Sequence, residues 1–161
     1  MKIFSIVGWS GSGKTTLITR LIGHFKARGR RVVAVKSTHA GYGVQPEGKD
    51  TARFLQAGAE EAYLLAGREL LRMTSLAEPE ELLAELAARL GQDDIVLMEG
   101  LTRPGIPIIE VEPPQGANAL KTGSEELAAL VGTAHGAAGR PRFHPDRIAD
   151  IATFMEEHHE R

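Results

Sequence analysis

Residues Lys2–Ile22, "KIFSIVGWSGSGKTTLITRLI", decide how this chain folds. The apolar run at the start of this stretch predicts a buried strand over Ile3–Val7. Apolar residues from Leu17 to Phe25 recur at helical spacing and predict a helix after the glycines. An ordinary turn between a strand and a helix does not need three glycines and two serines. A turn whose backbone must wrap closely around a ligand does need them.

The turn itself, Gly8–Thr15, fits the pattern G-x-x-x-x-G-K-[ST] of the phosphate-binding P-loop without a mismatch. Glycines let the backbone N–H groups approach a triphosphate, and the following helix directs the positive end of its dipole at it. Lys14 would bring a full charge to the β and γ phosphates, the Thr15 hydroxyl would bind Mg²⁺, and Thr16 would assist at an α-phosphate oxygen. The predicted cradle comprises Gly8, Ser10, Gly11, Ser12, Gly13, Lys14, Thr15 and Thr16.

The composition is that of a folded globular protein. It has 161 residues, of which 42 % are hydrophobic, a net charge of −2 and no cysteine. Disulfides and thiolate metal sites are therefore excluded, and nothing favours nucleic acid or a membrane as a partner. The N-terminus shows no secretory pattern, so we expect a cytoplasmic protein.

The order of the remaining segments indicates the fold class. Apolar runs that predict strands alternate with helical patterns, and glycine and proline mark the loops between them. This alternation is typical of an α/β protein with a mostly parallel central sheet and helices on both faces. We expect one P-loop nucleotide-binding domain over residues 1–161. Beyond the first strand and helix, the expected strands cover 31–36, two runs around Gly67, 95–99, 106–111 and 127–132, and the expected helices cover 50–57, 79–90 and a segment from Pro145 onward.

Two further segments carry polar residues at the carboxyl ends of predicted strands, where open parallel sheets bind their ligands. "IVLMEG" ends in Glu99, which is either the acid that holds magnesium or a surface acid at a strand end. After the second strand, the candidates are Lys36, His39, Lys49 and Asp50 in a glycine-rich loop that could sense a γ-phosphate. Asp50 is a second candidate metal ligand, or a group that orients water, or a cap for the helix that starts there.

Three motifs together resemble one family. "GWSGSGKTTL", "VKSTH" with "GKDTARFLQAGA", and "IVLMEGL" follow one another as in molybdopterin-guanine dinucleotide biosynthesis protein B. The resemblance runs from about Ile3 to Val111. It implies a P-loop fold that binds GTP with magnesium, forms a homodimer and assists the guanylyltransferase that attaches GMP to molybdopterin, with molybdopterin-loaded proteins as further partners. It also implies that Asp50 and Glu99 lie near the metal and that Lys36 and His39 belong to the loop over the nucleotide.

The residues leave other functions open. GTP is implied by the resemblance alone, because no Asn-Lys-x-Asp guanine motif occurs in the chain. A small-molecule kinase would use the same cradle and would carry arginines on a lid, for which Arg68 and Arg72 are candidates. A non-catalytic, nucleotide-dependent scaffold is a third reading. As an enzyme, the chain would be at most a weak GTPase that depends on Lys14, Asp50 and Glu99.

Overall fold

The structure is a computed structural model, and it describes residues 1–37, 49–74, 78–113, 120–123, 125–133 and 139–158. The chain forms two compact units. The first unit comprises Met1–Ser37 and Leu90–Arg161, and the second comprises Thr38–Arg89.

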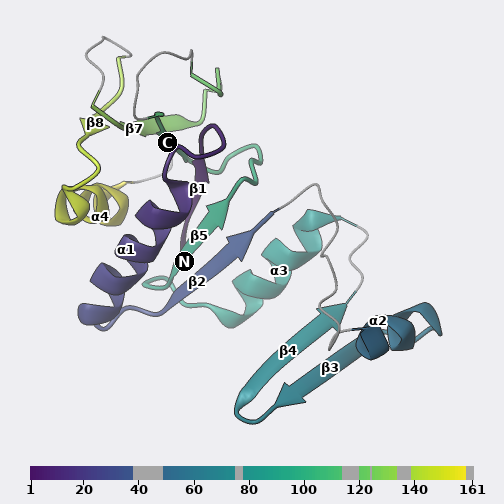
Figure 1. Ribbon diagram of the computed structural model, residues 1–161. Coiled ribbons are helices and arrows are strands. Elements are labelled where there is room, and N and C mark those ends of the chain that lie inside the picture. Colours follow the sequence, from purple (N-terminus) through teal and green to yellow (C-terminus); the bar gives the residue numbers. More distant parts are fainter. Residues whose placement is uncertain (38–48, 75–77, 114–119, 124, 134–138, 159–161) are drawn as a thin grey trace. The chain divides into compact units, whose positions relative to one another are not determined.

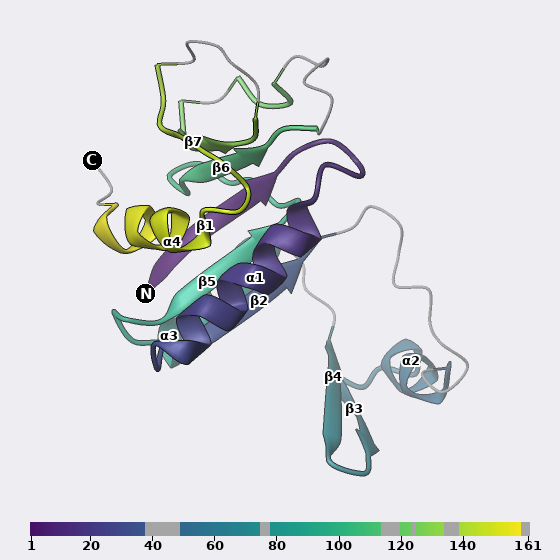
Figure 2. The same cartoon turned by 60° about the vertical axis from the view of Figure 1, so that its left-hand side comes forward.

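The first unit is built on a six-stranded sheet in which every pair of neighbouring strands is parallel. Figures 1 and 2 together show these strands (Figure 1, Figure 2). Across the sheet the order is β2 (Val32–Lys36), β5 (Ile95–Glu99), β1 (Lys2–Val7), β6 (Ile108–Val111), β7 (Leu127–Val131) and β8 (Arg142–Phe143).

The central position of β1 follows from its neighbours. Ile3 pairs with Val96 of β5, and Ser5 pairs with Ile108 of β6. In β5, the residues from Ile95 to Met98 are all at most 1 % exposed, as expected for a strand of a parallel sheet with apolar residues on both faces. The glycine turn that follows Val7 therefore lies between the carboxyl ends of β5 and β6.

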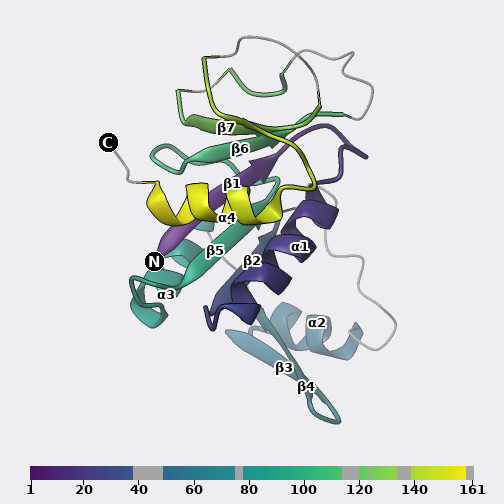
Figure 3. The same ribbon diagram turned by 90° about the vertical axis from the view of Figure 1, so that its left-hand side faces the viewer.

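Helices α1 (Lys14–Ala27) and α4 (Ile148–Glu157) lie side by side on one face of this sheet (Figure 3). Arg28 and Arg30, just after α1, both form ion pairs with Glu156 of α4, at 3.3 and 3.2 Å. The core between helices and sheet is apolar and includes Phe4, Ile6, Leu17, Leu21, Phe25, Leu97, Ile109, Ile151 and Met155.

The second unit contains an antiparallel hairpin. Its strands turn at Gly67, which has a φ of 60°, and α2 contacts both of them. Arg72 on the second strand joins Glu61 to Glu85, and the Arg72–Glu85 pair spans 2.7 Å. The elements are α2 (Lys49–Gln56), β3 (Glu61–Ala66), β4 (Glu69–Thr74) and α3 (Pro79–Arg89).

The predicted α/β fold with its mostly parallel sheet is confirmed, and so are the two strands around Gly67. Strand β8 was not predicted, because two residues are too few to produce a period. The last helix begins at Ile148 rather than at Pro145. Within the described ranges, no helix has the length and apolar character needed to span a membrane.

Candidate functional site

The turn between β1 and α1 takes a path that only glycines follow easily. Gly8, Gly11 and Gly13 have φ values of 147°, 76° and 97°. A Cβ atom on Gly8 would lie 2.3 Å from the carbonyl oxygen of Val111 at the end of β6. The turn thus combines left-handed backbone with a close approach to the neighbouring strand, and both demand the absence of a side chain.

The first backbone N–H groups of α1 have no hydrogen-bond partner within the helix. Gly13 is the N-cap residue and provides no side-chain hydrogen bond, and the first turn contains no acidic residue. The first helical bond runs from the N–H of Leu17 to the carbonyl oxygen of Gly13, at 2.9 Å. The preceding N–H groups of the helix have no partner within it, so this end favours an anion such as phosphate.

Lys14 folds back over the turn. Its amine donates to the carbonyl oxygens of Gly8, at 3.0 Å, and Trp9, at 2.8 Å. Burial lowers the pKa of the Lys14 amine, the charge on Glu99 opposes this shift, and the charges on Lys121 and Lys36 add to it. The charge of Lys14 is thus opposed by two other lysines and favoured by one carboxylate. The negative charges of a bound polyphosphate would offset the repulsion between the lysines.

Glu99 connects the glycine turn to β2. The Thr15 hydroxyl donates to Oε2 of Glu99 at 2.8 Å, and the Lys36 amine lies 3.2 Å from Oε1 of Glu99. The contact arises from topology, because Lys36 and Glu99 are register partners at the carboxyl ends of β2 and β5. The structure therefore brings together Lys14, Thr15, Glu99 and Lys36, four of the residues singled out from the sequence.

The Thr15 and Glu99 oxygens fit magnesium but do not make a complete site. Mg²⁺ prefers hard oxygen ligands and commonly keeps waters and phosphate oxygens around one or two protein ligands. No group of three or more His, Cys, Asp or Glu side chains that could hold a metal occurs in the described part of the chain. A hydroxyl and a carboxylate 2.8 Å apart suit a metal ion whose remaining ligands come from a nucleotide.

Ser12 gives independent support for a ligand at the turn. Its hydroxyl is buried and has no hydrogen-bond partner. Such a group destabilises the fold by about 1–3 kcal/mol unless something binds to it. Ser10 and Thr16, also predicted as cradle residues, are exposed next to it and at the start of α1.

The other candidates from the sequence lie in the second unit or outside the described residues. Asp50 lies in α2 of the second unit, one residue after the helix begins, and its role as a metal ligand stays a prediction. Lys49 begins the same helix. His39 lies outside the described residues.

One residue near the turn was missed by the sequence reasoning. Glu110 is 1 % exposed although it is charged, and it pairs with Val7 at the end of β1. Its carboxylate accepts the backbone N–H groups of Lys121 and Thr122, the latter at 3.0 Å. An acid inside the apolar run "IPIIEV" was the available signal.

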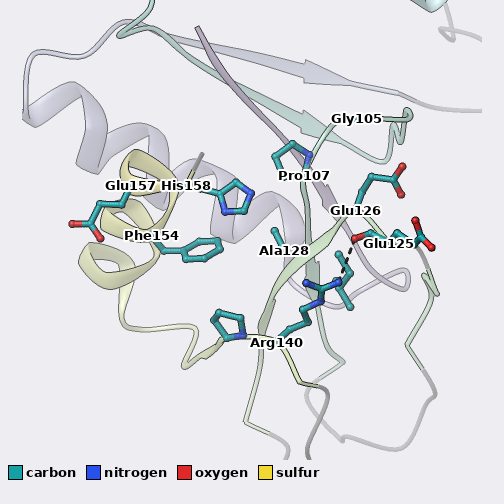
Figure 4. Close-up of a pocket in the computed structure, with 11 residues that line it drawn as sticks. Gly105, Pro107, Glu125, Glu126, Ala128, Arg140, Phe154, Glu157 and His158 are labelled. Carbon is teal, nitrogen blue, oxygen red and sulfur yellow. Dashed lines mark hydrogen bonds between the residues drawn. The ribbon is translucent and has the colours of Figure 1, made fainter. Parts of the chain in front are cut away.

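A pocket lies at the opposite end of the sheet (Figure 4). Its volume is about 700 Å³, and Pro107, Ala128, Arg140, Phe154 and His158 are among the residues that line it. Pro107 and Glu126 precede β6 and β7, so the pocket lies at the amino ends of these strands. None of the predicted site residues lines it, and the glycine turn at the carboxyl ends remains the candidate site.

Comparison with known proteins gives the family. The model of the family "Molybdopterin guanine dinucleotide synthesis protein B" matches residues 3–133. The chain belongs to this family.

Relatives and solved structures agree with this family assignment. A molybdopterin-guanine dinucleotide biosynthesis adapter protein of Haemophilus influenzae is 34 % identical over 161 residues, covering 98 % of this chain and 90 % of that protein. The adapter protein of Escherichia coli is 37 % identical over 101 residues, covering 61 % of this chain and 58 % of that one. A crystal structure of molybdopterin-guanine biosynthesis protein B superposes with a TM-score of 0.69, at 29 % identity, over 96 % of this chain and 97 % of that chain.

We predict that Gly8→Ala disrupts the site. The added Cβ would meet backbone of β6 at 2.3 Å, so the turn must move and the Lys14 contacts must change. We expect a loss of stability of more than about 2 kcal/mol, measured by urea unfolding.

The control is Gly23→Ala in α1, where an added Cβ meets nothing within 4 Å. This variant should stabilise the helix by about 0.5–1 kcal/mol. Equal stability of the Gly8 variant and the wild type would show that the close approach to Val111 is not a constraint.

Proposed function

We propose that this protein is a GTP-binding, magnesium-dependent adapter in molybdopterin-guanine dinucleotide biosynthesis. The observation that carries the proposal is the Thr15–Glu99 contact of 2.8 Å at the end of a glycine turn with the P-loop pattern. The pathway and the adapter role come from the names of the relatives, which are molybdopterin-guanine dinucleotide biosynthesis adapter proteins. The preference for GTP over ATP is part of the proposal and comes from the family resemblance.

The charges around the turn support a nucleoside triphosphate as the ligand. The triphosphate of a nucleotide carries about four negative charges, and a helix N-terminus with free N–H groups, Lys14 and the hydroxyls of Thr15 and Ser12 are suited to them. Glu99 and Thr15 would hold magnesium beside the β and γ phosphates, where the ion would screen their charge. Protein residues then position the phosphates and the ion without any covalent chemistry of their own.

The same residues support slow hydrolysis at most. In the first unit, the described side chains around Lys14 and Glu99 include no arginine or glutamine bonded to either of them. Such a group is commonly supplied by a partner and accelerates hydrolysis by about 10³–10⁵-fold. We therefore propose that the protein assists the molybdopterin guanylyltransferase and proteins loaded with molybdopterin, and that its own GTP turnover is on the order of 10⁻⁴ to 10⁻² s⁻¹.

The kinase reading has less support. Arg72, one of its two lid candidates, is joined to Glu61 and Glu85 within the second unit. Phosphoryl transfer to a hydroxyl acceptor at about 1–100 s⁻¹ would nevertheless favour a kinase over an adapter.

The base preference gives the first test of the function. With Mg²⁺, GTP at a hundred times its Kd should stabilise the fold by about 2.7 kcal/mol, which raises the Tm by about 5–10 °C, and ATP should do less. Differential scanning fluorimetry measures both shifts. Lys14→Ala should abolish both shifts in Tm. It removes the amine that contacts Gly8 and Trp9 in this structure and that would bind the phosphates of the nucleotide. Equal shifts with GTP and ATP would remove the guanine preference.

The role of Glu99 is tested by Glu99→Gln. The amide keeps the shape and one acceptor but loses the charge that faces Thr15 and Lys36. We expect GTP affinity in EDTA within about threefold of the wild type, while the gain in affinity on adding Mg²⁺ falls by about tenfold. Isothermal titration calorimetry with and without Mg²⁺ measures this gain. Glu157→Gln, at an exposed residue near the end of α4, is the control, and identical magnesium dependence in both variants would make Glu99 a surface acid.

The hairpin supports the proposed homodimer. Leu65 and Leu70 are directly opposite on β3 and β4 and are 71 % and 63 % exposed, and Tyr63 on the same face is 52 % exposed. The same face also carries the Glu61–Arg72 ion pair, so its apolar part is the end formed by Tyr63, Leu65 and Leu70. We propose that a second copy of the chain covers this face.

Light scattering after size exclusion tests the dimer. Leu65→Asp combined with Leu70→Asp places two charges on the proposed interface, so we expect a monomer, or a dimer weakened by more than about tenfold. The control is Leu120→Asp, at a leucine of the first unit that is 37 % exposed. A wild-type chain that is monomeric at high concentration would contradict the homodimer.

A further inference from the structure

Glu110 is a buried carboxylate whose position requires an explanation. It is 1 % exposed in β6, and burial of a charged group is unfavourable unless hydrogen bonds satisfy it. Both of its oxygens accept backbone N–H groups, one from Lys121 and one from Thr122. The carboxylate thus holds the segment that returns toward β7 at a fixed place beside the carboxyl end of β6.

That place is next to the glycine turn. Glu110 pairs with Val7, the residue before Gly8, and Val111 is the residue that a Cβ on Gly8 would strike. The side chain of Lys121 is exposed, and its positive charge contributes to lowering the pKa of the Lys14 amine. Lys36 acts on the same amine from the other side, that of β2 and β5.

The two flanking lysines differ in their partners. Lys36 forms an ion pair with Glu99, the proposed magnesium acid, and so belongs to the γ-phosphate end of the site. Lys121 lies on the β6 side, where Glu110 accepts its backbone N–H and its side chain is exposed. A nucleotide whose magnesium end lies toward β5 must extend its remaining phosphates and its nucleoside away from Glu99, and β6 is the strand on that side of β1.

We propose that Lys121 is a nucleotide-binding residue, and that buried Glu110 is the positioning residue that fixes it on the β6 side of the glycine turn. The Lys121 amine binds the diphosphate portion that GTP and GDP have in common. This inference rests on the proposed nucleotide-binding function and adds to it a cation on the β6 side of the glycine turn, whereas Glu99 lies on the β5 side.

The test compares GTP and GDP in isothermal titration calorimetry of the full chain with Mg²⁺. Lys121→Ala should weaken both nucleotides by the same factor, about tenfold, because a charge-assisted contact to a shared group is lost. Lys121→Arg should retain most of the affinity. Lys26→Ala removes an exposed lysine from the last turn of α1, at the far end of that helix, and serves as the control.

The positioning role has its own readout. Glu110→Gln turns one acceptor into an N–H group that faces a backbone N–H, so the segment should lose its fixed place. Nucleotide affinity should then fall as it does in Lys121→Ala, and the double variant should lose no more than either single one. A variant with lower Tm but unchanged nucleotide affinity would reduce Glu110 to a purely structural role. If Glu110→Gln does not fold, the Lys121 variants still decide the nucleotide contact.

The outcomes separate the two proposals. If the wild type binds neither GTP nor GDP, the proposed function and this inference fail together. If the wild type binds both, Lys14→Ala does not, and Lys121→Ala equals Lys26→Ala, this inference alone is overturned. A loss confined to GTP would also overturn it, because it would place Lys121 at the γ-phosphate.

Discussion

The approach of Gly8 to the carbonyl oxygen of Val111 is the constraint on which the site depends. A Cβ atom on residue 8 would lie 2.3 Å from the carbonyl oxygen of Val111, which is too close for any real contact. β1 and β6 can therefore be neighbours at their carboxyl ends only with glycine at this position. The turn that follows is then fixed between β5 and β6, in the middle of the sheet. Every polar group of the site is placed relative to this turn: Lys14 and Thr15 by α1, Glu99 by β5 and Glu110 by β6.

The polar groups of the site contact one another in a way that a ligand would change. Lys14 donates to two carbonyl oxygens of its own turn, and Glu99 accepts from Thr15 and pairs with Lys36. Phosphate oxygens are better partners for Lys14 than neutral carbonyls, and a divalent cation is a better partner for Glu99 than one amine. Lys36 is the last residue of β2. Its release from Glu99 would therefore free its side chain at the point where the chain leaves the sheet.

The sequence predicted what depends on local pattern and on topology. Strand β1, the glycine turn and α1 follow from one stretch with clear periodicity, and Glu99 follows because parallel strands present their carboxyl ends at one edge. Glu110 could not be placed in this way, because its partners, Lys121 and Thr122, are backbone groups of an irregular segment eleven and twelve residues along the chain. The apolar face of Leu65 and Leu70 was also beyond prediction, since alternating residues in a hairpin do not say which face is left uncovered.

A crystal structure with GTP and Mg²⁺ tests the account most directly. We predict that the phosphates lie in the glycine turn with the Lys14 amine and the first N–H groups of α1, that the ion lies at Thr15 and Glu99, and that Lys36 leaves the carboxylate. A nucleotide bound elsewhere, with Lys14 still on the carbonyl oxygens of Gly8 and Trp9 and Glu99 still paired with Lys36, would contradict it.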